Sequence, residues 1–148
     1  MKRNAFMMLL VLLMGSSAFA MLLDENKTYH GEGRWKDAFG NTGLYSVHTE
    51  IKNKTISANY KFEDKEINFS MTALDKGFGY YDIIINTPPL NVTGEAYCFD
   101  SFCHMTFPGK EQLEESFRFF EGKLERLGSK IIDGRKIVWR EELYQVSP

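Results

Sequence analysis

The sequence lacks the motifs that identify most enzymes and metalloproteins. No nucleophile elbow, phosphate-binding loop or zinc-hydrolase signature occurs, and the three histidines have no spacing suited to a metal or haem site. We therefore expect no catalytic residue, no metal and no cofactor. An enzyme remains the minority hypothesis, because catalytic residues need not be contiguous in sequence.

Long apolar runs are also missing, except at the N-terminus. Two basic residues precede an apolar run over residues 5–14, and a small-x-small cleavage site ends at Ala20. This pattern predicts a signal peptide over residues 1–20 and a single domain over residues 21–148. The run is shorter than the roughly 20 residues that span a bilayer. An uncleaved anchor is the alternative, because residues 21–23 are apolar too.

An excess of basic charge is absent as well. After loss of residues 1–20, 16 of the 18 basic residues remain against 20 acidic residues. Nucleic-acid binding requires a basic surface that displaces counterions, so we expect no nucleic-acid partner and no stable membrane insertion after cleavage. Export would place the protein in the periplasm or in the secreted fraction.

Alternating apolar residues dominate the stretch from 42 to 107. Short turn signals at 53–54, 64–65 and 75–77 divide it into strands that keep one apolar face, which predicts an antiparallel meander. Asp133-Gly134 signals a further hairpin near the C-terminus.

The two cysteines flank one of these turns. If Asp100-Ser101 is the turn, Phe99 lies opposite Phe102 and Cys98 lies opposite Cys103, with Cα atoms about 4.5 to 5.5 Å apart. This separation suits a disulfide, so we predict a structural Cys98–Cys103 bridge. A redox or metal site involving the cysteines and His104 is the less favoured alternative.

The period changes after Pro108-Gly109. Apolar residues recur at helical spacing at Leu113, Phe117, Phe120, Leu124 and Leu127. This spacing predicts an amphipathic helix over 111–127, ended by Gly128 and docked on the sheet. Its acidic residues argue against the alternative of a membrane-bound helix.

Together these elements predict a mainly β fold. Strands of similar length joined by tight turns favour an antiparallel up-and-down barrel of about eight or nine strands, with one helix near the C-terminus. A β-sandwich is the alternative, but its Greek-key topology needs longer crossovers.

The first strand carries Gly33-Arg34-Trp35, which resembles the Gly-x-Trp element of lipocalins and related calycins. The Thr-Asp-Tyr element of lipocalins is replaced here by the sequence at 99–102. The resemblance implies a barrel closed at one end by Gly33 and Trp35, with Arg140 packed across the Trp and Arg135 as its competitor. It also implies that the barrel binds or carries a small molecule.

The inward face of the predicted barrel supplies the candidate ligand-binding residues. They are Trp35, Tyr45, Tyr60, Phe69, Met71 and Tyr81. Buried tyrosine hydroxyls need partners, so the favoured function is the binding of a small, mostly apolar molecule in the lumen. A filled core is weighed equally. It would favour an envelope interaction module that binds another, unidentified protein through Tyr97, Phe99 and Phe102.

Overall fold

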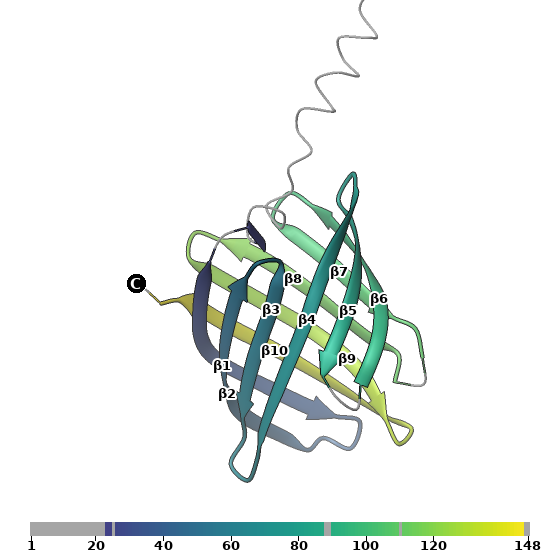
Figure 1. The fold of residues 1–148 in the computed structure, drawn as a ribbon. Helices are drawn as coiled ribbons and strands as arrows, with labels where there is room; N and C mark the ends of the chain where they lie inside the picture. Colours follow the sequence, from purple (N-terminus) through teal and green to yellow (C-terminus); the bar gives the residue numbers. More distant parts are fainter. Residues whose placement is uncertain (1–22, 25, 88–89, 110, 147–148) are drawn as a thin grey trace, which may run out of the picture.

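The computed structural model describes residues 23–24, 26–87, 90–109 and 111–146. These residues form ten strands (Figure 1). The strands are β1 (Lys27–Asp37), β2 (Thr42–Lys52), β3 (Thr55–Lys61), β4 (Glu66–Gly77), β5 (Tyr80–Thr87), β6 (Leu90–Phe99), β7 (Phe102–Phe107), β8 (Leu113–Phe120), β9 (Lys123–Ile132) and β10 (Arg135–Gln145).

Each strand pairs antiparallel with its neighbours in sequence, and β1 pairs with β10, so that the sheet closes into a barrel. Trp35 lies opposite Trp139 across the closing pair of strands. Closure leaves no sheet edge free for pairing with another chain. This architecture is the closed up-and-down barrel expected from the sequence, with ten strands in place of eight or nine.

The two ends of the barrel differ in their connections (Figure 1). We call the end with the turns at 53–54, 78–79, 100–101 and 121–122 the upper end, and the end with the connections at 38–41, 62–65 and 133–134 the lower end. Leu23 is buried at the upper end, where its carbonyl accepts a hydrogen bond from the amide of Lys54. The first described residues therefore lie at the upper end.

Tight turns explain the up-and-down order. Three hairpins have both central residues at positive φ, namely Asn53-Lys54, Phe78-Gly79 and Asp133-Gly134. Positive φ at both positions is the type I′ geometry, whose twist matches that of the paired strands. Phe78 is exceptional among them, since a bulky side chain rarely adopts this conformation.

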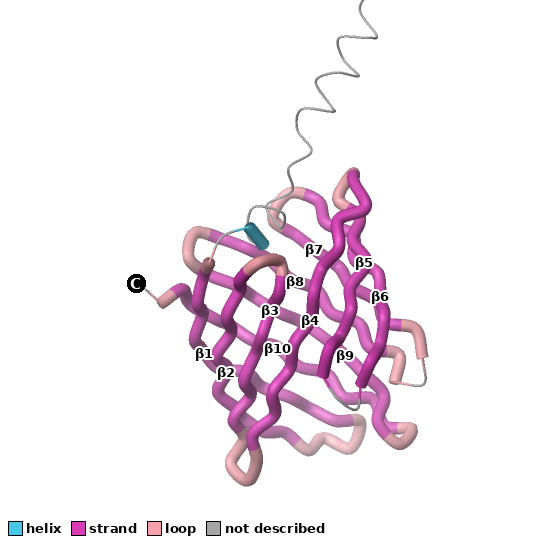
Figure 2. The backbone as a smooth tube through the Cα atoms, in the orientation of Figure 1, coloured by secondary structure: helices cyan, strands magenta, loops and turns pink. Residues whose placement is uncertain are grey.

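The helix predicted over 111–127 does not exist. Residues 113–120 belong to β8 and residues 123–127 to β9, with a turn at Glu121-Gly122 between them, and helical residues in the described chain occur only at Leu23 and Asp24 (Figure 2). The helical spacing was misleading because Phe120 and Leu127 face outward, whereas Phe117 and Leu124 face inward. The two strands are needed to close the sheet between β7 and β10.

The predicted registers were partly right. Ile51 lies opposite Ile56, as expected for a turn at 53–54. The 64–65 turn is displaced by one residue, so that Ile67 faces Tyr60 rather than Phe62. At the next hairpin the turn moves to Phe78-Gly79, with a bulge between Asp75 and Gly77. In both hairpins the register partner itself changes by an even number of residues, so the apolar side chains still face inward.

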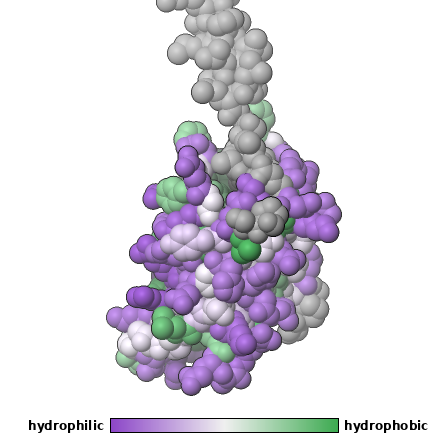
Figure 3. Space-filling view, turned by 90° about the vertical axis from the view of Figure 1, so that its left-hand side faces the viewer, coloured by the Kyte–Doolittle hydropathy of each residue, from purple (hydrophilic) through white to green (hydrophobic). Residues whose placement is uncertain are grey.

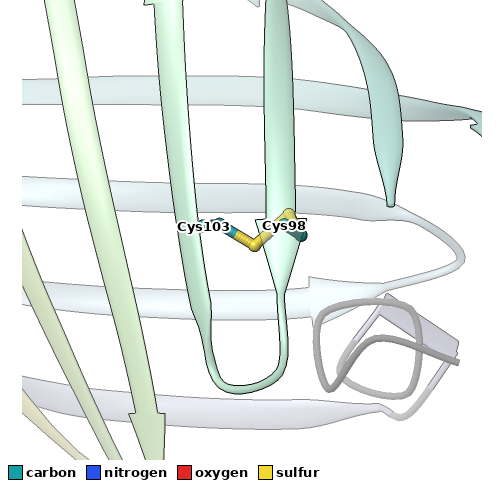
Figure 4. The surroundings of a disulfide bond; sticks show 2 residues. All are labelled: Cys98 and Cys103. Carbon is teal, nitrogen blue, oxygen red and sulfur yellow. A yellow bond between two sulfur atoms is a disulfide. The ribbon is translucent and has the colours of Figure 1, made fainter. Parts of the chain in front are cut away.

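The disulfide prediction is confirmed. Cys98 and Cys103 are register partners, and their bridge joins β6 to β7 just before the hairpin turn (Figure 4). Their Cα atoms lie 4.1 Å apart, somewhat closer than expected. Both side chains are buried, so the bridge belongs to the barrel core.

The outer wall is mainly hydrophilic on the side of the barrel that carries β1, where only small hydrophobic patches interrupt it (Figure 3). Within the described ranges, no helix has the length and hydropathy that a transmembrane span requires.

Candidate functional site

Five polar side chains meet inside the lower half of the barrel. Arg126 of β9 lies between Glu115 of β8 and Glu141 of β10, with Tyr45 of β2 and Tyr60 of β3 completing the group. We call these five residues the lumen cluster. The guanidinium and both carboxylates are almost completely shielded from solvent; Arg126 is 2% exposed and Glu141 is 1% exposed. Charged groups are rarely buried to this extent unless they are paired.

Both Nη atoms of Arg126 contact neighbouring side chains. Its Nη2 donates to Glu115 Oε1 at 2.8 Å, while Nη1 donates to the Tyr60 hydroxyl at 2.6 Å and lies 2.9 Å from Glu141 Oε2. The aromatic rings of Phe117 and Tyr60 also pack against the guanidinium, with centroids 5.1 and 5.8 Å away. Burial opposes the charge, but the two carboxylates outweigh it and hold the pKa of Arg126 well above its usual value.

For Glu141, unlike Arg126, the environment favours the neutral form. Burial raises the pKa of its carboxyl group, and the attraction of Arg126 offsets this only in part because Arg126 is shared with Glu115. Its Oε1 accepts a hydrogen bond of 2.9 Å from the Tyr45 hydroxyl. Burial and the charge of Glu141 together raise the pKa of Tyr45, so this hydroxyl keeps its proton and remains a donor.

Gly33 makes the contact between Tyr45 and Glu141 possible. Gly33 is the register partner of Tyr45 on β2 and of Glu141 on β10, so it lies between them on the inner wall. The ring of Tyr45 lies directly over Gly33, where a Cβ atom would clash with it. The glycine is therefore required by the close approach of a side chain rather than by a turn.

Tyr60 connects opposite walls. β3 and β9 are separated by three other strands in the barrel order, yet the Tyr60 hydroxyl reaches Arg126. The rings of Tyr45 and Tyr60 lie 6.0 Å apart, and Tyr45 also stacks on Phe62 at 4.9 Å. The lumen cluster therefore crosses the barrel from one side to the other.

Three buried polar atoms remain without a hydrogen-bond partner among the described residues. They are Arg126 Nε, Glu141 Oε2 and Thr49 Oγ1. The contact between Glu141 Oε2 and Arg126 Nη1 is close enough for an ion pair but is not an aligned hydrogen bond. Unsatisfied buried polar groups are uncommon in folded proteins and mark places where a water molecule or a ligand atom binds.

The lower end is lined with aromatic side chains. Trp35 and Trp139 are neighbours on the inner wall, but Trp35 lies over Gly43 and Trp139 over Gly128, so the two indole rings lean away from each other. Both tryptophans are half-buried. In contrast to the upper half, the inner wall here combines aromatic rings with the charged groups above them.

All six predicted ligand-binding residues lie on the inner wall, but the structure does not gather them into one group. Tyr45 and Tyr60 belong to the lumen cluster, and Trp35 lies at the lower end. Met71 and Tyr81 are buried in the apolar core, against which Phe69 packs.

Arg140 lies elsewhere than the resemblance implied. It is on the outer wall, 61% exposed, and pairs with Glu142 at 2.7 Å. The basic residue that packs inside against aromatic rings is Arg126. Arg135, the competitor, packs over the exposed Phe39 near the lower end.

Sequence reasoning missed Glu115, Arg126 and Glu141. The first two fell within the predicted helix, where charge suggests a solvated face. Glu141 interrupts the alternation of Ile137, Trp139 and Leu143 in β10, and a charge at an inward position of a strand is the signal that could have revealed it.

No protein-family model matches the sequence, and no curated protein does. A solved structure, that of the S-type phycobiliprotein lyase CPES from Guillardia theta, has a similar fold, with a TM-score of 0.68 over 92% of this chain and 97% of that chain. The two sequences are 8% identical. The similarity supports the lipocalin-like barrel.

Proposed function

We propose that this chain is an exported protein that binds a small, mostly apolar molecule inside the barrel. The observation that carries the proposal is the lumen cluster, which sets hydrogen-bonding groups without partners among aromatic and aliphatic side chains. Binding sites for small molecules are mostly apolar with a few convergent polar groups. The sequence predicts orientation of the ligand by one or two of Tyr45, Tyr60 and Tyr81, and the first two of these belong to the cluster.

Export is supported by two independent features. The sequence of residues 1–20 has the composition of a signal peptide, and a disulfide persists mainly in oxidising compartments. We place the protein in the periplasm or in the secreted fraction. The fold similarity to a protein named as a phycobiliprotein lyase is compatible with the binding of a small molecule.

The test is saturable binding of a neutral apolar dye, Nile red, to the purified protein. We expect binding of one dye per chain. Ala58→Phe, which adds bulk at a buried inward position of β3, should weaken it, whereas Ser57→Phe on the outer wall should not. Absence of saturable binding to the wild-type protein would contradict the proposal whether or not the variants fold.

A second function, binding of another exported protein, is favoured by one observation. Residues 113–127 form strands rather than a helix that could cover Tyr97, Phe99 and Phe102, and these side chains are 46%, 71% and 41% exposed. Phe78 and Tyr80 are exposed as well, and Tyr80 packs on Tyr97. An exposed aromatic face of this kind is typical of interaction surfaces.

A photo-reactive amino acid distinguishes this second function. Placed at Phe99, it should give one discrete cross-linked adduct in the exporting host, while the same group at the exposed Leu44 of β2 should not. Equal labelling from both positions would argue against a specific partner.

A further inference from the structure

The charges of the lumen cluster do not balance. Two carboxylates, Glu115 and Glu141, share the single guanidinium of Arg126, and all three groups are buried. The hydroxyls of Tyr45 and Tyr60, which also contact these groups, carry no charge. A buried cluster with both acids ionised therefore holds one uncompensated negative charge, which is costly in a protein interior.

The excess charge is located at Glu141. Glu115 accepts an aligned hydrogen bond from Arg126, whereas Glu141 Oε2 accepts none from the described residues. The guanidinium does not satisfy this oxygen, because its Nη atoms are directed to Glu115 and Tyr60 and its Nε has no hydrogen-bond partner among the described residues. The acceptor left over is thus a buried carboxylate oxygen.

We propose that the ligand held by the lumen cluster is a cation, an apolar molecule with an amine or amidine group that binds Glu141 Oε2. This inference rests on the proposed function and names the class of its ligand. An ammonium supplies two features that Glu141 lacks, a positive charge and a donor for Oε2. The rings of Tyr45 and Tyr60, whose hydroxyls belong to the cluster, favour a cation in the same place.

The presence of a buried arginine would ordinarily suggest an anionic ligand. Here a carboxylate ligand would bring a third acid to one guanidinium and increase the unpaired charge. The lumen cluster should therefore favour a cationic ligand over an anionic ligand of equal size.

Proton binding offers an alternative way of balancing the charge without a ligand. Burial raises the pKa of Glu141, so the empty cluster approaches neutrality by retaining a proton on this carboxyl group. Arg126, Glu115, Tyr45 and Tyr60 are the charged and titratable groups that face it. An ammonium that binds Oε2 replaces this proton, and the proton passes to solvent.

The experiment compares three probes of the same chain length, decylammonium, decanol and decanoate, by titration calorimetry at pH 8 with the purified protein. We expect decylammonium to bind one per chain and at least about tenfold more tightly than the other two. Glu141→Gln should abolish this preference. Glu142→Gln, on the outer wall and ion-paired there with Lys123, should retain it.

The outcomes separate the two proposals. Equal or tighter binding of decanol or decanoate overturns the inference of a cationic ligand and leaves the proposed function intact. No binding of any probe overturns the inference, and the Nile red titration then decides on the function. If Glu141→Gln fails to fold, Glu115→Gln makes the same change of charge from β8, and a retained preference for decylammonium in that variant would contradict the inference.

Discussion

The two halves of the barrel are built on different principles. The upper half is filled by aliphatic, aromatic and cystine side chains, with Leu23 buried at its end. The lower half contains the lumen cluster and the two tryptophans that lean apart over glycines. Packing stabilises the first half, whereas buried ion pairs contribute little net stability to the second. The difference indicates that apolar packing in the upper half maintains the fold, and it locates the proposed binding site in the lower half.

The largest effect should follow from loss of Arg126. Arg126→Met leaves two buried carboxylates without a counter-charge, which should lower the free energy of unfolding by about 3 to 5 kcal/mol. Arg140→Met removes an arginine from an exposed ion pair of the outer wall and should cost about 1 kcal/mol or less. Urea denaturation of both variants measures the difference, and similar losses would show that the cluster is not critical for the lower half.

The upper half should respond to a change in packing. Leu23→Ala removes a buried side chain and should cost about 2 to 5 kcal/mol, depending on how far the barrel end relaxes. Leu44→Ala, at an exposed position of β2, should change stability by about 0.5 kcal/mol at most. If Leu23→Ala loses no more stability than the control, the upper end does not depend on the Leu23 side chain.

The pH dependence of stability should separate the halves further. The pKa of Glu141 is raised on folding, so its contribution is fully present below the unfolded value near 4.5 and is lost as pH rises through the folded value. Relative to Glu141→Gln, the wild-type protein should lose up to about 1.4 kcal/mol per pH unit above pH 4.5. Denaturation of both proteins at several pH values measures the slope.

Glu142 provides the matched control on the opposite face. Hydrogen bonding and attraction from Lys123 lower its pKa, so its contribution is present above the unfolded value and is lost as pH falls. Glu142→Gln should therefore still lose stability as the pH rises above 4.5, as predicted for the wild-type protein. A wild-type stability that rises with pH relative to Glu141→Gln would contradict the assignment.

The smallest effect should come from the upper hairpin. Phe78 adopts a positive φ and is 83% exposed, so its conformation is unfavourable and its side chain gains little from burial. Phe78→Asn creates the Asn-Gly pair favoured in type I′ turns and should add about 1 kcal/mol to stability. Phe39→Asn, an exposed position without positive φ, should bring no gain. Thermal denaturation gives the comparison.

Much of the barrel was predictable because the inward positions of β2 to β7 are mostly apolar or aromatic and turn signals lie at or near the hairpins. Cys98 and Cys103 could be paired for the same reason, since an Asp-Ser turn fixes their register. β8 and β9 were not predictable in this way. Their inward positions include Glu115, Arg126 and Gly128, which remove the alternation, while Phe120 and Leu127 on the outer wall complete a helical pattern by coincidence.

The lumen cluster was hidden for a related reason. Tyr45 and Tyr60 were recognised as inward residues that needed partners, but the partners come from strands far away in the sequence. Their pairing depends on closure of the sheet between β1 and β10. Local patterns contain no information on which residues meet across a barrel.

Gly33 has a consequence for the evolution of this protein. Because the phenol ring of Tyr45 occupies the space of a side chain at position 33, the two positions are expected to vary together among homologues. Sequences that have a larger residue in place of this glycine should also have a shorter one in place of the tyrosine. Such paired replacement would trace, through the history of the lineage, when the acidic group on the last strand gained or lost its hydroxyl partner.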